Sequence, residues 1–521
     1  MKHLAKVYSA ELEGISAKLI EVEVDINIGL HSFNIVGLAD KATSEAKERV
    51  SSALKNSGVK PPTRENRKIT VNLAPADIKK SGSQYDLAIA VGYLLATGQL
   101  RVFDTADKIF IGELSLQGTV RPVNGALNIA RLGKKLGFKF LFLPKGNCVE
   151  AAIVRGIKII PVQNIEELIN HLEERDFIAP QRETEFEAGN NQAIVQISEI
   201  KGQENAKRAL TVAAAGGHHL LMSGPPGAGK TMLAQALSSI LPPLTLEEAI
   251  EITQIWSAAG LVKENFFLNS RPFRSPHHTA SPVAIVGGGQ NPKPGEISLA
   301  HLGVLFLDEI PEYRRDLLES LRQPLESGQI HVSRAKGTLV FPARFSLVAA
   351  MNPCPCGYFG DSEKECRCTA NEVFRYQKKI SGPLLDRIDI QIEVPRVKIA
   401  SLREVSRREK ELRDKKKDDR DGEIREQVRK ARQIQEERFS KTKPKIRVNA
   451  EMSSKQVDEF VNFDDSAENF LKNILEKSFV SARGYYRILK ISRTIADLEK
   501  TERVSANHLA EAFQYRVREK E

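Results

Sequence analysis

Residues 224–231 read Gly-Pro-Pro-Gly-Ala-Gly-Lys-Thr and fit the pattern G-x-x-x-x-G-K-[ST]. In this pattern a glycine-rich loop turns its backbone N–H groups toward phosphate oxygens. Residues 219–222 predict a buried strand before the loop, and residues 232–241 predict a helix after it, whose positive end adds to the phosphate site. We expect the whole loop to bind a nucleoside triphosphate: Gly224, Pro225, Pro226, Gly227, Ala228, Gly229, Lys230 and Thr231. Lys230 is expected at the β- and γ-phosphates, and Thr231 is expected to ligate Mg²⁺.

A second segment carries the acids that such a site needs. The apolar run from Gly303 to Leu307 ends on Asp308 and Glu309. Five such residues predict a strand buried on both faces, as in a parallel sheet. We expect Asp308 to complete the Mg²⁺ shell and Glu309 to polarise the attacking water, which makes the site a hydrolase site rather than a kinase site. For either acid alone, the alternative is a residue that only caps the strand.

Composition bounds the class of protein. The chain has 521 residues, 41% of them apolar and 28% charged, which predicts a globular protein of two or three domains. A net charge of +10 favours a polyanionic partner. We see no signal peptide and no uncharged apolar run of about 18 residues, so we expect no membrane span and a cytoplasmic location.

Four regions follow one another along the chain. Residues 1–175 mix strand and helix patterns, residues 176–196 form a polar linker, residues 197–395 hold the P-loop core, and residues 396–521 read as helical. Within the last region, residues 403–438 carry many charges of both signs. This pattern predicts a solvated, salt-bridged helix pair, with contact to DNA as the alternative.

Further polar residues extend the P-loop site. Asn352 follows a predicted strand at residues 345–349 and corresponds to the residue called sensor 1 in AAA+ ATPases, which orients water or senses the γ-phosphate. Residues 382–389 resemble the segment that supplies an arginine finger, here Arg387, to a neighbouring subunit. Arg483 is placed where such proteins carry a second sensor, and Arg487, on the same helical face, is the alternative. Together these residues predict a ring-forming AAA+ ATPase.

Longer motifs resemble the magnesium chelatase branch of AAA+ proteins: residues 271–281 (RPFRSPHHTAS), 286–289 (VGGG) and 294–301 (PGEISLAH). Residues 33–40 (FNIVGLAD) narrow the resemblance to the bacterial YifB/ComM family. The resemblance implies an α/β chain with an N-terminal S5/Lon-like α+β domain, an AAA+ P-loop core with helices on both faces of a parallel sheet, and a C-terminal helical lid. It also implies ATP and Mg²⁺ as cofactors and a homo-hexameric ring. ComM members are DNA helicases that drive branch migration during natural transformation.

A hairpin supports a DNA partner. Residues 330–341 predict a β-hairpin with basic residues at its tip, and they resemble the pre-sensor-1 hairpin of MCM helicases. In a ring such hairpins point into the pore, where Arg334 and Lys336 would grip phosphates of single-stranded or branched DNA without reading sequence. Recombination proteins are then candidate partners. The alternative is an ordinary exposed turn.

The cysteines suggest a metal. Four of the five lie within fifteen residues as two C-x-C pairs, Cys354 with Cys356 and Cys366 with Cys368. This arrangement does not resemble the disulfide framework of a secreted protein. Four thiolates suit a tetrahedral, structural Zn²⁺ site, although reduced free thiols or a redox-labile loop are the alternatives.

The N-terminal region resembles the domain of Lon proteases and RadA. A Lon-type protease needs a serine nucleophile activated by a lysine. Matching the Lon motifs puts Gln84 at the nucleophile and Leu127 about where the lysine belongs, so we expect a proteolytically inactive domain that is a scaffold or binds DNA. Ser81, Ser83 and Lys80 leave a shifted dyad open.

Three functions remain open. The leading hypothesis is an ATP-driven motor that moves on DNA and migrates branched junctions. The second is a chelatase-type ATPase that inserts metal into a tetrapyrrole, against which the appended Lon-like domain and the four cysteines argue. The third is a regulatory ring that remodels a protein partner.

Overall fold

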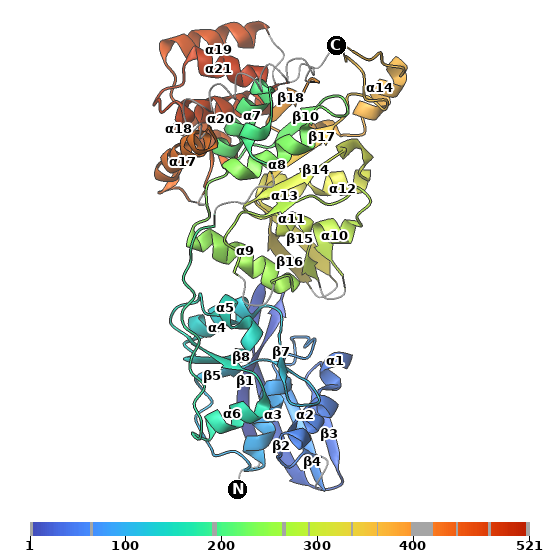
Figure 1. Cartoon of the computed structure of the whole chain (residues 1–521), viewed down its shortest axis with the longest axis vertical. Coiled ribbons are helices and arrows are strands. Elements are labelled where there is room, and N and C mark those ends of the chain that lie inside the picture. Colours follow the sequence, from blue (N-terminus) through green and yellow to red (C-terminus); the bar gives the residue numbers. More distant parts are fainter. Residues whose placement is uncertain are drawn as a thin grey trace.

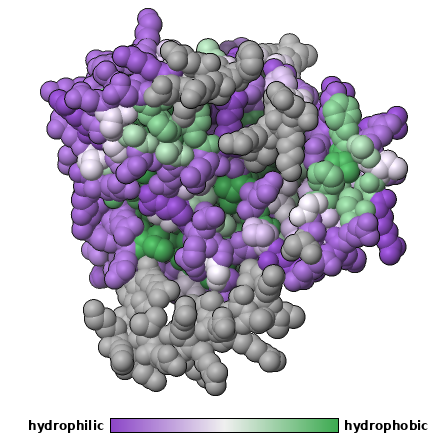
Figure 2. All heavy atoms as spheres, turned by 90° about the horizontal axis from the view of Figure 1, so that it is seen from above, coloured by the Kyte–Doolittle hydropathy of each residue, from purple (hydrophilic) through white to green (hydrophobic). Residues whose placement is uncertain are grey.

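The computed structural model describes residues 4–62, 66–189, 195–262, 267–289, 292–334, 337–361, 363–396, 420–443, 446–477 and 481–516. The molecule is elongated, with the N-terminal region at one end and the P-loop core and C-terminal helices at the other (Figure 1). Seen from above, the C-terminal end is mainly hydrophilic, with a few small hydrophobic patches (Figure 2). Among the described residues, no helix has the length and apolar character to cross a membrane.

The N-terminal region is built on one mixed sheet of seven strands in the order β3-β4-β2-β1-β5-β8-β9. Their bounds are β1 (Leu4–Glu13), β2 (Ser16–Ile28), β3 (Ser32–Val36), β4 (Arg67–Ala74), β5 (Lys108–Phe110), β8 (Phe140–Pro144) and β9 (Lys158–Val162). The strand β2 pairs antiparallel with both β1 and β4, whereas the neighbours from β1 to β9 pair parallel. In β2 every second side chain is buried, as its period-two sequence predicts: Ile20, Val22, Val24 and Ile26.

The described part of this region also contains helices and a short ribbon: α1 (Lys41–Ser44), α2 (Ala46–Asn56), α3 (Asp86–Ala96), β6 (Glu113–Leu114), β7 (Val120–Arg121), α4 (Ala126–Leu136), η2 (Lys145–Asn147), α5 (Cys148–Ala151) and α6 (Ile165–Leu172). The helices α1 and α2 follow one another directly and are divided at Glu45. Asp40 caps the first of them by accepting a hydrogen bond from the Thr43 N–H.

The protease-like positions are held in polar contacts of their own. The Glu11 carboxylate, 4% exposed, accepts hydrogen bonds from Gln84 Nε2 at 2.9 Å, from Ser81 Oγ at 2.9 Å and from the Tyr85 hydroxyl. Ser83 donates to Glu113, and Lys80 donates to the Pro75 carbonyl. Leu127 is fully buried. Neither of the two serine hydroxyls therefore has Lys80 as its hydrogen-bond partner among the described residues.

The core sheet is parallel and has five strands in the order β11-β14-β17-β10-β18. Their bounds are β10 (Leu220–Ser223), β11 (Phe273–Arg274), β14 (Val304–Leu307), β17 (Ser346–Met351) and β18 (Ile390–Glu393). Alternate side chains of one strand enter different hydrophobic clusters, because successive residues point to opposite faces. Val304 and Phe306 join the cluster that includes α7 (Glu204–Gly216) and α8 (Lys230–Ile240). Leu305 and Leu307 join the cluster on the other face.

Helices therefore cover both faces, as Figure 1 shows. The remaining elements of the core are η3 (Ile197–Glu199), α9 (Leu246–Ala259), α10 (Pro282–Val286), β12 (Gly287–Gly288), β13 (Lys293–Pro294), α11 (Glu296–Leu299), η4 (Ile310–Glu312), α12 (Arg315–Ser320), α13 (Arg322–Ser327), β15 (Gln329–Arg334), β16 (Gly337–Pro342), α14 (Ala370–Gln377) and α15 (Gly382–Leu385).

The C-terminal region is helical: α17 (Arg420–Phe439), η5 (Asn449–Glu451), α18 (Ser454–Phe460), α19 (Asp465–Lys477), α20 (Ala482–Leu498) and α21 (Ala506–Gln514). The solvated helix pair predicted at residues 403–438 is only partly correct. Residues 403–419 lie outside the described residues, and α17 buries one face against the core through Val428, Ala431, Gln435 and Phe439. With the mixed sheet and the parallel sheet, these helices confirm the predicted fold class.

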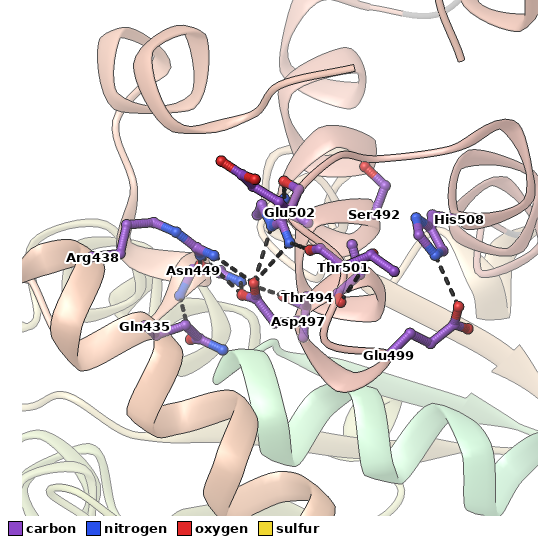
Figure 3. Close-up of polar contacts among 12 residues, drawn as sticks. Gln435, Arg438, Asn449, Ser492, Thr494, Asp497, Glu499, Thr501, Glu502 and His508 are labelled. Atoms are coloured by element: carbon purple, nitrogen blue, oxygen red, sulfur yellow. Dashed lines mark hydrogen bonds and ion pairs between the residues drawn. The ribbon is translucent and has the colours of Figure 1, made fainter. Parts of the chain in front are cut away.

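A buried ion network joins the C-terminal helices (Figure 3). Asp497, 1% exposed, accepts hydrogen bonds from Arg438 Nη1 at 2.9 Å, Arg493 Nε at 3.1 Å and Asn449 Nδ2 at 2.8 Å. These three donors come from α17, α20 and the turn between α17 and α18. Because an unpaired charge is very costly to bury, the network fixes how these elements pack on one another.

The N-terminal region contacts the core through α9. The Gly125 N–H, at the start of α4, donates to the Ser257 carbonyl at 3.1 Å, and Asn128 Nδ2 donates to the Gln254 carbonyl at 3.3 Å. The predicted linker contains no helix or strand over its described residues, 176–189 and 195–196, yet it is hydrogen-bonded to the N-terminal region. Thr184 Oγ1, for example, donates to the Val149 carbonyl at 2.7 Å.

The buried Glu11 carboxyl gives the first prediction. Burial, the largest effect, raises the pKa of Glu11 from 4.5 to about 7, although hydrogen bonds from Tyr85 and Ser81 oppose the shift. The folded state then holds this proton more tightly than the unfolded state does. The stability is therefore present below about pH 4.5 and lost as the pH rises through about 7, a loss of about 3 kcal/mol.

We expect Glu11→Gln to remove this loss. Thermal unfolding of the full chain, followed from about pH 5 to about pH 8, should show a smaller fall in Tm for the variant than for the wild type. Asp86, whose pKa burial also raises, to about 6, is present in both proteins and cancels in the difference. Parallel curves would contradict the assignment of the proton to Glu11.

Candidate nucleotide-binding site

Three segments of the predicted site meet at one edge of the core sheet. The P-loop follows β10, Asn352 follows β17, and Asp308 follows β14. These strands are neighbours and run parallel, so their carboxyl ends lie side by side. The crevice outside the carboxyl ends of such a sheet is where ligands bind in open α/β folds.

The P-loop requires glycine at three positions, for two different structural reasons. A Cβ on Gly224 would lie 2.2 Å from the Val394 carbonyl oxygen, so a side chain cannot be placed there. Gly227 and Gly229 have φ values of 78° and 88°, in the left-handed region that favours glycine. The helix α8 then begins at Lys230 and directs its N-terminal N–H groups toward the loop.

Lys230 is buried between the loop and Asn352. Its ammonium donates to the Gly224 carbonyl at 2.6 Å, to the Pro225 carbonyl at 3.1 Å and to Asn352 Oδ1 at 3.0 Å. Burial lowers the pKa of Lys230, and the charges of Asp308 and Glu309 oppose that effect. A cation held against loop carbonyls at the edge of the crevice is placed to exchange these acceptors for phosphate oxygens.

The Mg²⁺-binding candidates also meet. Thr231 Oγ1 donates to Asp308 Oδ2 at 2.9 Å, although 77 residues separate them in the sequence. A hydroxyl and a carboxylate oxygen are the hard ligands that Mg²⁺ takes in nucleotide sites. These two residues therefore fit the ion that the sequence predicts.

Glu309 stands beside this pair in a strained backbone conformation. Its φ is 50°, which is uncommon for a residue with a Cβ, and its N–H donates to Asp308 Oδ1 at 3.0 Å. Its side chain is exposed, whereas the four residues of β14 before Asp308 are all buried. Strain of this kind is concentrated at functional sites, and it turns the Glu309 carboxylate out of the sheet.

Arg387 lies at the opposite edge of the sheet. It precedes β18, which pairs parallel with β10, so Arg387 is at the amino end of the strands and the P-loop is at the carboxyl end. Four strand residues separate the two edges by about 13 Å. Arg387 forms an ion pair with Glu326 and donates to the Pro383 carbonyl.

The two candidate sensor arginines are on the Arg387 side. A cavity of about 820 Å³ is lined by Arg387, Arg483 and Arg487 together with residues of both the core and the C-terminal helices. Lys230, Thr231, Asp308, Glu309 and Asn352 are not among its lining residues. Arg483 is exposed, whereas Arg487 lies 3.9 Å from both Asp386 and Asp389.

A buried histidine that the motifs did not indicate supports this edge. His218 is fully buried, and its Nδ1 lies 3.1 Å from Asp389 Oδ2 while its Nε2 lies 2.8 Å from Thr494 Oγ1. Burial alone would raise the pKa of Asp389, but His218, His219 and Lys490 together outweigh it and hold the pKa below its usual range. Thr494 also accepts from Asn449 Nδ2, at 3.0 Å, so the network of Figure 3 reaches Asp389.

Gln203 is a second residue that sequence reasoning missed. Its Nε2 donates to the Pro395 carbonyl at 2.6 Å and lies 3.5 Å from the Ala228 carbonyl of the P-loop. Its φ of 59° places it in the left-handed region, directly before α7. The dipeptide Gly202-Gln203 before a helical pattern was the only signal available.

The predicted hairpin forms, since β15 and β16 pair antiparallel from Gln329 with Pro342 to Arg334 with Gly337. Its flank touches the N-terminal region, where a Cβ on Gly14 would lie 3.5 Å from side-chain atoms of Leu339 and Phe341. Lys336 and the side chain of Arg334 lie outside the described residues, so the proposed DNA contacts stay a prediction.

The four clustered cysteines form a group that could hold a metal ion. The Sγ atoms of Cys354, Cys356, Cys366 and Cys368 all lie within 4.8 Å of one another, and none is in a disulfide. Cys366 Sγ is 3.7 Å from Cys354 Sγ and 3.6 Å from Cys356 Sγ. Tetrahedral Zn²⁺ with sulfur ligands at about 2.3 Å requires about 3.8 Å between sulfurs, so the cluster fits this ion.

Three family models match the chain. "Magnesium chelatase, subunit ChlI" matches residues 196–402, "Subunit ChlI of Mg-chelatase" matches residues 22–147, and "Magnesium chelatase, subunit ChlI C-terminal" matches residues 419–516. Together the three models cover most of the chain. They confirm the predicted resemblance to the chelatase branch, whose AAA+ ATPase fold implies ATP hydrolysis.

Full-length relatives narrow the family. Competence protein ComM of Haemophilus influenzae is 42% identical over 99% of this chain and 97% of its own. The protein YifB of Escherichia coli is 39% identical over the same shares. Lon protease 2 of Bacillus subtilis is 28% identical over 30% of each chain. With the P-loop, the acidic strand end and the five-stranded parallel sheet in place, the chain belongs to the YifB/ComM family of magnesium chelatase-like AAA+ ATPases.

Proposed function

We propose that this protein is an ATP-driven motor that works on DNA as a ring of identical subunits, a hexamer in our proposal. One observation carries the ring: the phosphate-binding residues and the arginines lie at opposite edges of the same parallel sheet. A single chain therefore cannot bring Arg387 to its own P-loop. Subunits packed edge to edge would bring the arginines of one chain to the nucleotide of the next.

The carboxyl ends of the core strands, here called the P-loop edge, carry residues that each have a proposed role. Lys230 and the loop N–H groups would bind the phosphates of ATP, and Thr231 with Asp308 would hold Mg²⁺, whose charge would offset that of the phosphates. Glu309 accepts the proton of the attacking water. Asn352, in contact with Lys230, senses the γ-phosphate and orients that water.

The arginines at the amino ends of the strands, here called the arginine edge, complete the nucleotide site of the neighbouring subunit. Arg387 is the proposed finger that neutralises charge developing on the γ-phosphate in the transition state. Of the two second-sensor candidates, Arg487 lies 3.9 Å from the carboxylates of both Asp386 and Asp389. Arg483 is exposed and lines the same cavity. The geometry favours Arg483 as the phosphate contact and Arg487 as a brace for the segment that carries Arg387.

Three observations support DNA as the substrate. A full-length relative at 42% identity is named a competence protein. The β15–β16 hairpin lies directly before the strand that carries Asn352, so movement of the nucleotide site can be passed to it. In the sequence, Arg334 ends β15 and Lys336 comes just before β16, and such residues suit sequence-independent phosphate contacts on single-stranded or branched DNA. Branch migration of recombination intermediates is the activity that we propose.

A chelatase-type ATPase is the second candidate, because all three matching family models carry that name. We further propose Zn²⁺ as the ion of the four-cysteine cluster, on the sulfur spacing given above.

We expect Glu309→Gln to retain ATP binding and to lower steady-state ATP hydrolysis by about 10²- to 10⁴-fold, because the general base is lost while the phosphate contacts stay. Nucleotide titration and phosphate release measure the two properties separately. The matched control is Glu312→Gln, an exposed acid of η4 three residues further on. Equal hydrolysis in Glu309→Gln and the wild type would remove Glu309 as the base.

Rings that mix two variants test whether the P-loop of one subunit and Arg387 of its neighbour form one site. Neither Lys230→Ala nor Arg387→Ala should hydrolyse ATP alone, because each lacks one edge of every site. Mixing the two should restore part of the activity, since an interface between them can combine an intact P-loop with an intact Arg387. A mixture as inactive as its components would argue against an arginine that acts between subunits.

DNA dependence tests the substrate. We expect ATP hydrolysis to rise with single-stranded DNA and with a four-way junction, and the rise to be lost in Arg334→Ala/Lys336→Ala. Lys455→Ala/Lys472→Ala, exposed on α18 and α19, removes the same charge elsewhere and should behave like the wild type. A rate that is indifferent to every DNA would turn the search to tetrapyrrole or protein substrates.

A further inference from the structure

The four-cysteine cluster lies against the nucleotide site, not apart from it. Asn352 is two residues before Cys354, at the end of β17. Cys354 is fully buried, and the Gly357 N–H donates to the Cys354 carbonyl at 3.0 Å, which closes a tight turn. This cysteine turn, residues 354–357, therefore follows the phosphate-sensing residue without an intervening segment.

Gly357 brings the cysteine turn into contact with the P-loop. A Cβ at this position would lie 2.6 Å from Pro226 Cδ and 3.9 Å from Asn352 Cβ. Its φ is 84°, so both the backbone conformation and the close approach require glycine. The turn thus touches the P-loop on one side and Asn352 on the other, and Asn352 in turn accepts a hydrogen bond from Lys230 at 3.0 Å.

The same loop also contacts α14 and the end of β18. Gln377 Nε2 donates to the Pro353 carbonyl at 3.0 Å. Arg396, three residues after β18, lies 3.7 Å from Glu363 and over the Tyr358 ring at 5.9 Å. The position of the cysteine loop is therefore linked to three parts of the core around the nucleotide site.

The shape of this loop depends on its cysteines and on polar contacts, not on hydrophobic packing. Among the described residues between Cys354 and Thr369, only Gly357 is buried, so the loop has no hydrophobic core of its own. Backbone N–H groups point at the sulfurs, with Phe359 N 3.3 Å from Cys354 Sγ and Cys368 N 3.5 Å from Cys366 Sγ. Such hydrogen bonds orient and stabilise metal-bound thiolates. A metal is then the cross-link that fixes the two C-x-C pairs together.

We propose that a metal ion bound by Cys354, Cys356, Cys366 and Cys368 positions Pro226 and Asn352, so that the affinity of the chain for nucleotide depends on the metal. The inference rests on the proposed ATPase function and deepens it. The metal is structural, but the structure it maintains is one wall of the phosphate site. Four thiolates would fill the coordination shell of Zn²⁺, so the ion would contact neither nucleotide nor water.

The first test removes the metal. We expect elemental analysis to find zinc in the wild type and not in Cys366→Ser/Cys368→Ser, and this variant should bind a fluorescent ATP analogue at least about fivefold more weakly, the lower end of usual coupling between sites. Cys148→Ala changes the one cysteine outside the cluster, buried in the N-terminal region, and should keep both zinc and affinity. Circular dichroism checks that the secondary structure is retained.

The second test keeps the metal and breaks the contact. Gly357→Ala leaves all four thiols in place but drives a methyl group into Pro226, so this variant should retain zinc and still bind the analogue more weakly. It also keeps the proposal testable if the double cysteine variant fails to fold. Gly360→Ala is the matched control, because Gly360 has a similar φ of 78° and its Cβ would meet open space.

The outcomes separate the two proposals. A wild type that holds zinc but does not bind the ATP analogue would overturn the ATPase function itself. A wild type that binds the analogue but contains no zinc would overturn the metal site. Wild-type affinity in a zinc-free cysteine variant, or in zinc-loaded Gly357→Ala, would overturn the coupling and leave the ATPase proposal intact.

Discussion

The polarity of the core sheet is the constraint on which the rest of the structure depends. Because all five strands run parallel, everything that follows a strand lies at one edge and everything that precedes a strand lies at the other. Lys230, Asp308 and Asn352 follow strands, whereas Arg387 precedes one. Neither a side-chain rotation nor a loop movement within one chain can bring Arg387 across the sheet, so the separation is built into the fold.

Buried charge holds the arginine edge to the C-terminal helices. Asp389 contacts His218, His218 contacts Thr494, and Thr494 shares Asn449 with the buried Asp497 (Figure 3). Removing one partner of a buried ion pair such as Arg438–Asp497 costs about 3–5 kcal/mol, because the other charge is left without compensation. The segment that carries Arg387 is therefore linked by polar contacts to a network that is expensive to break.

The sequence placed the residues of the P-loop edge together, whereas at the arginine edge it named the three arginines but not the contacts that hold them, for a physical reason. A P-loop or an acidic strand end is a local pattern, so Lys230, Thr231 and Asp308 could be named before the fold was known. His218 and Thr494 meet across 276 residues, and no spacing rule connects them. The sequence also did not reveal the buried face of α17, because its few apolar residues, such as Val428 and Ala431, lie among many charged ones.

Different interactions thus hold the P-loop edge and the arginine edge in place. At the P-loop edge, the cysteine turn contacts Pro226 and Asn352 and has almost no apolar packing of its own, so the thiol cluster and a few polar contacts hold its shape. At the arginine edge, a buried ion network positions the segment before β18. In a ring, one nucleotide would lie between the P-loop edge of one chain and the arginine edge of its neighbour. Loss of either would then disable a shared site, because each supplies contacts that the other edge cannot reach.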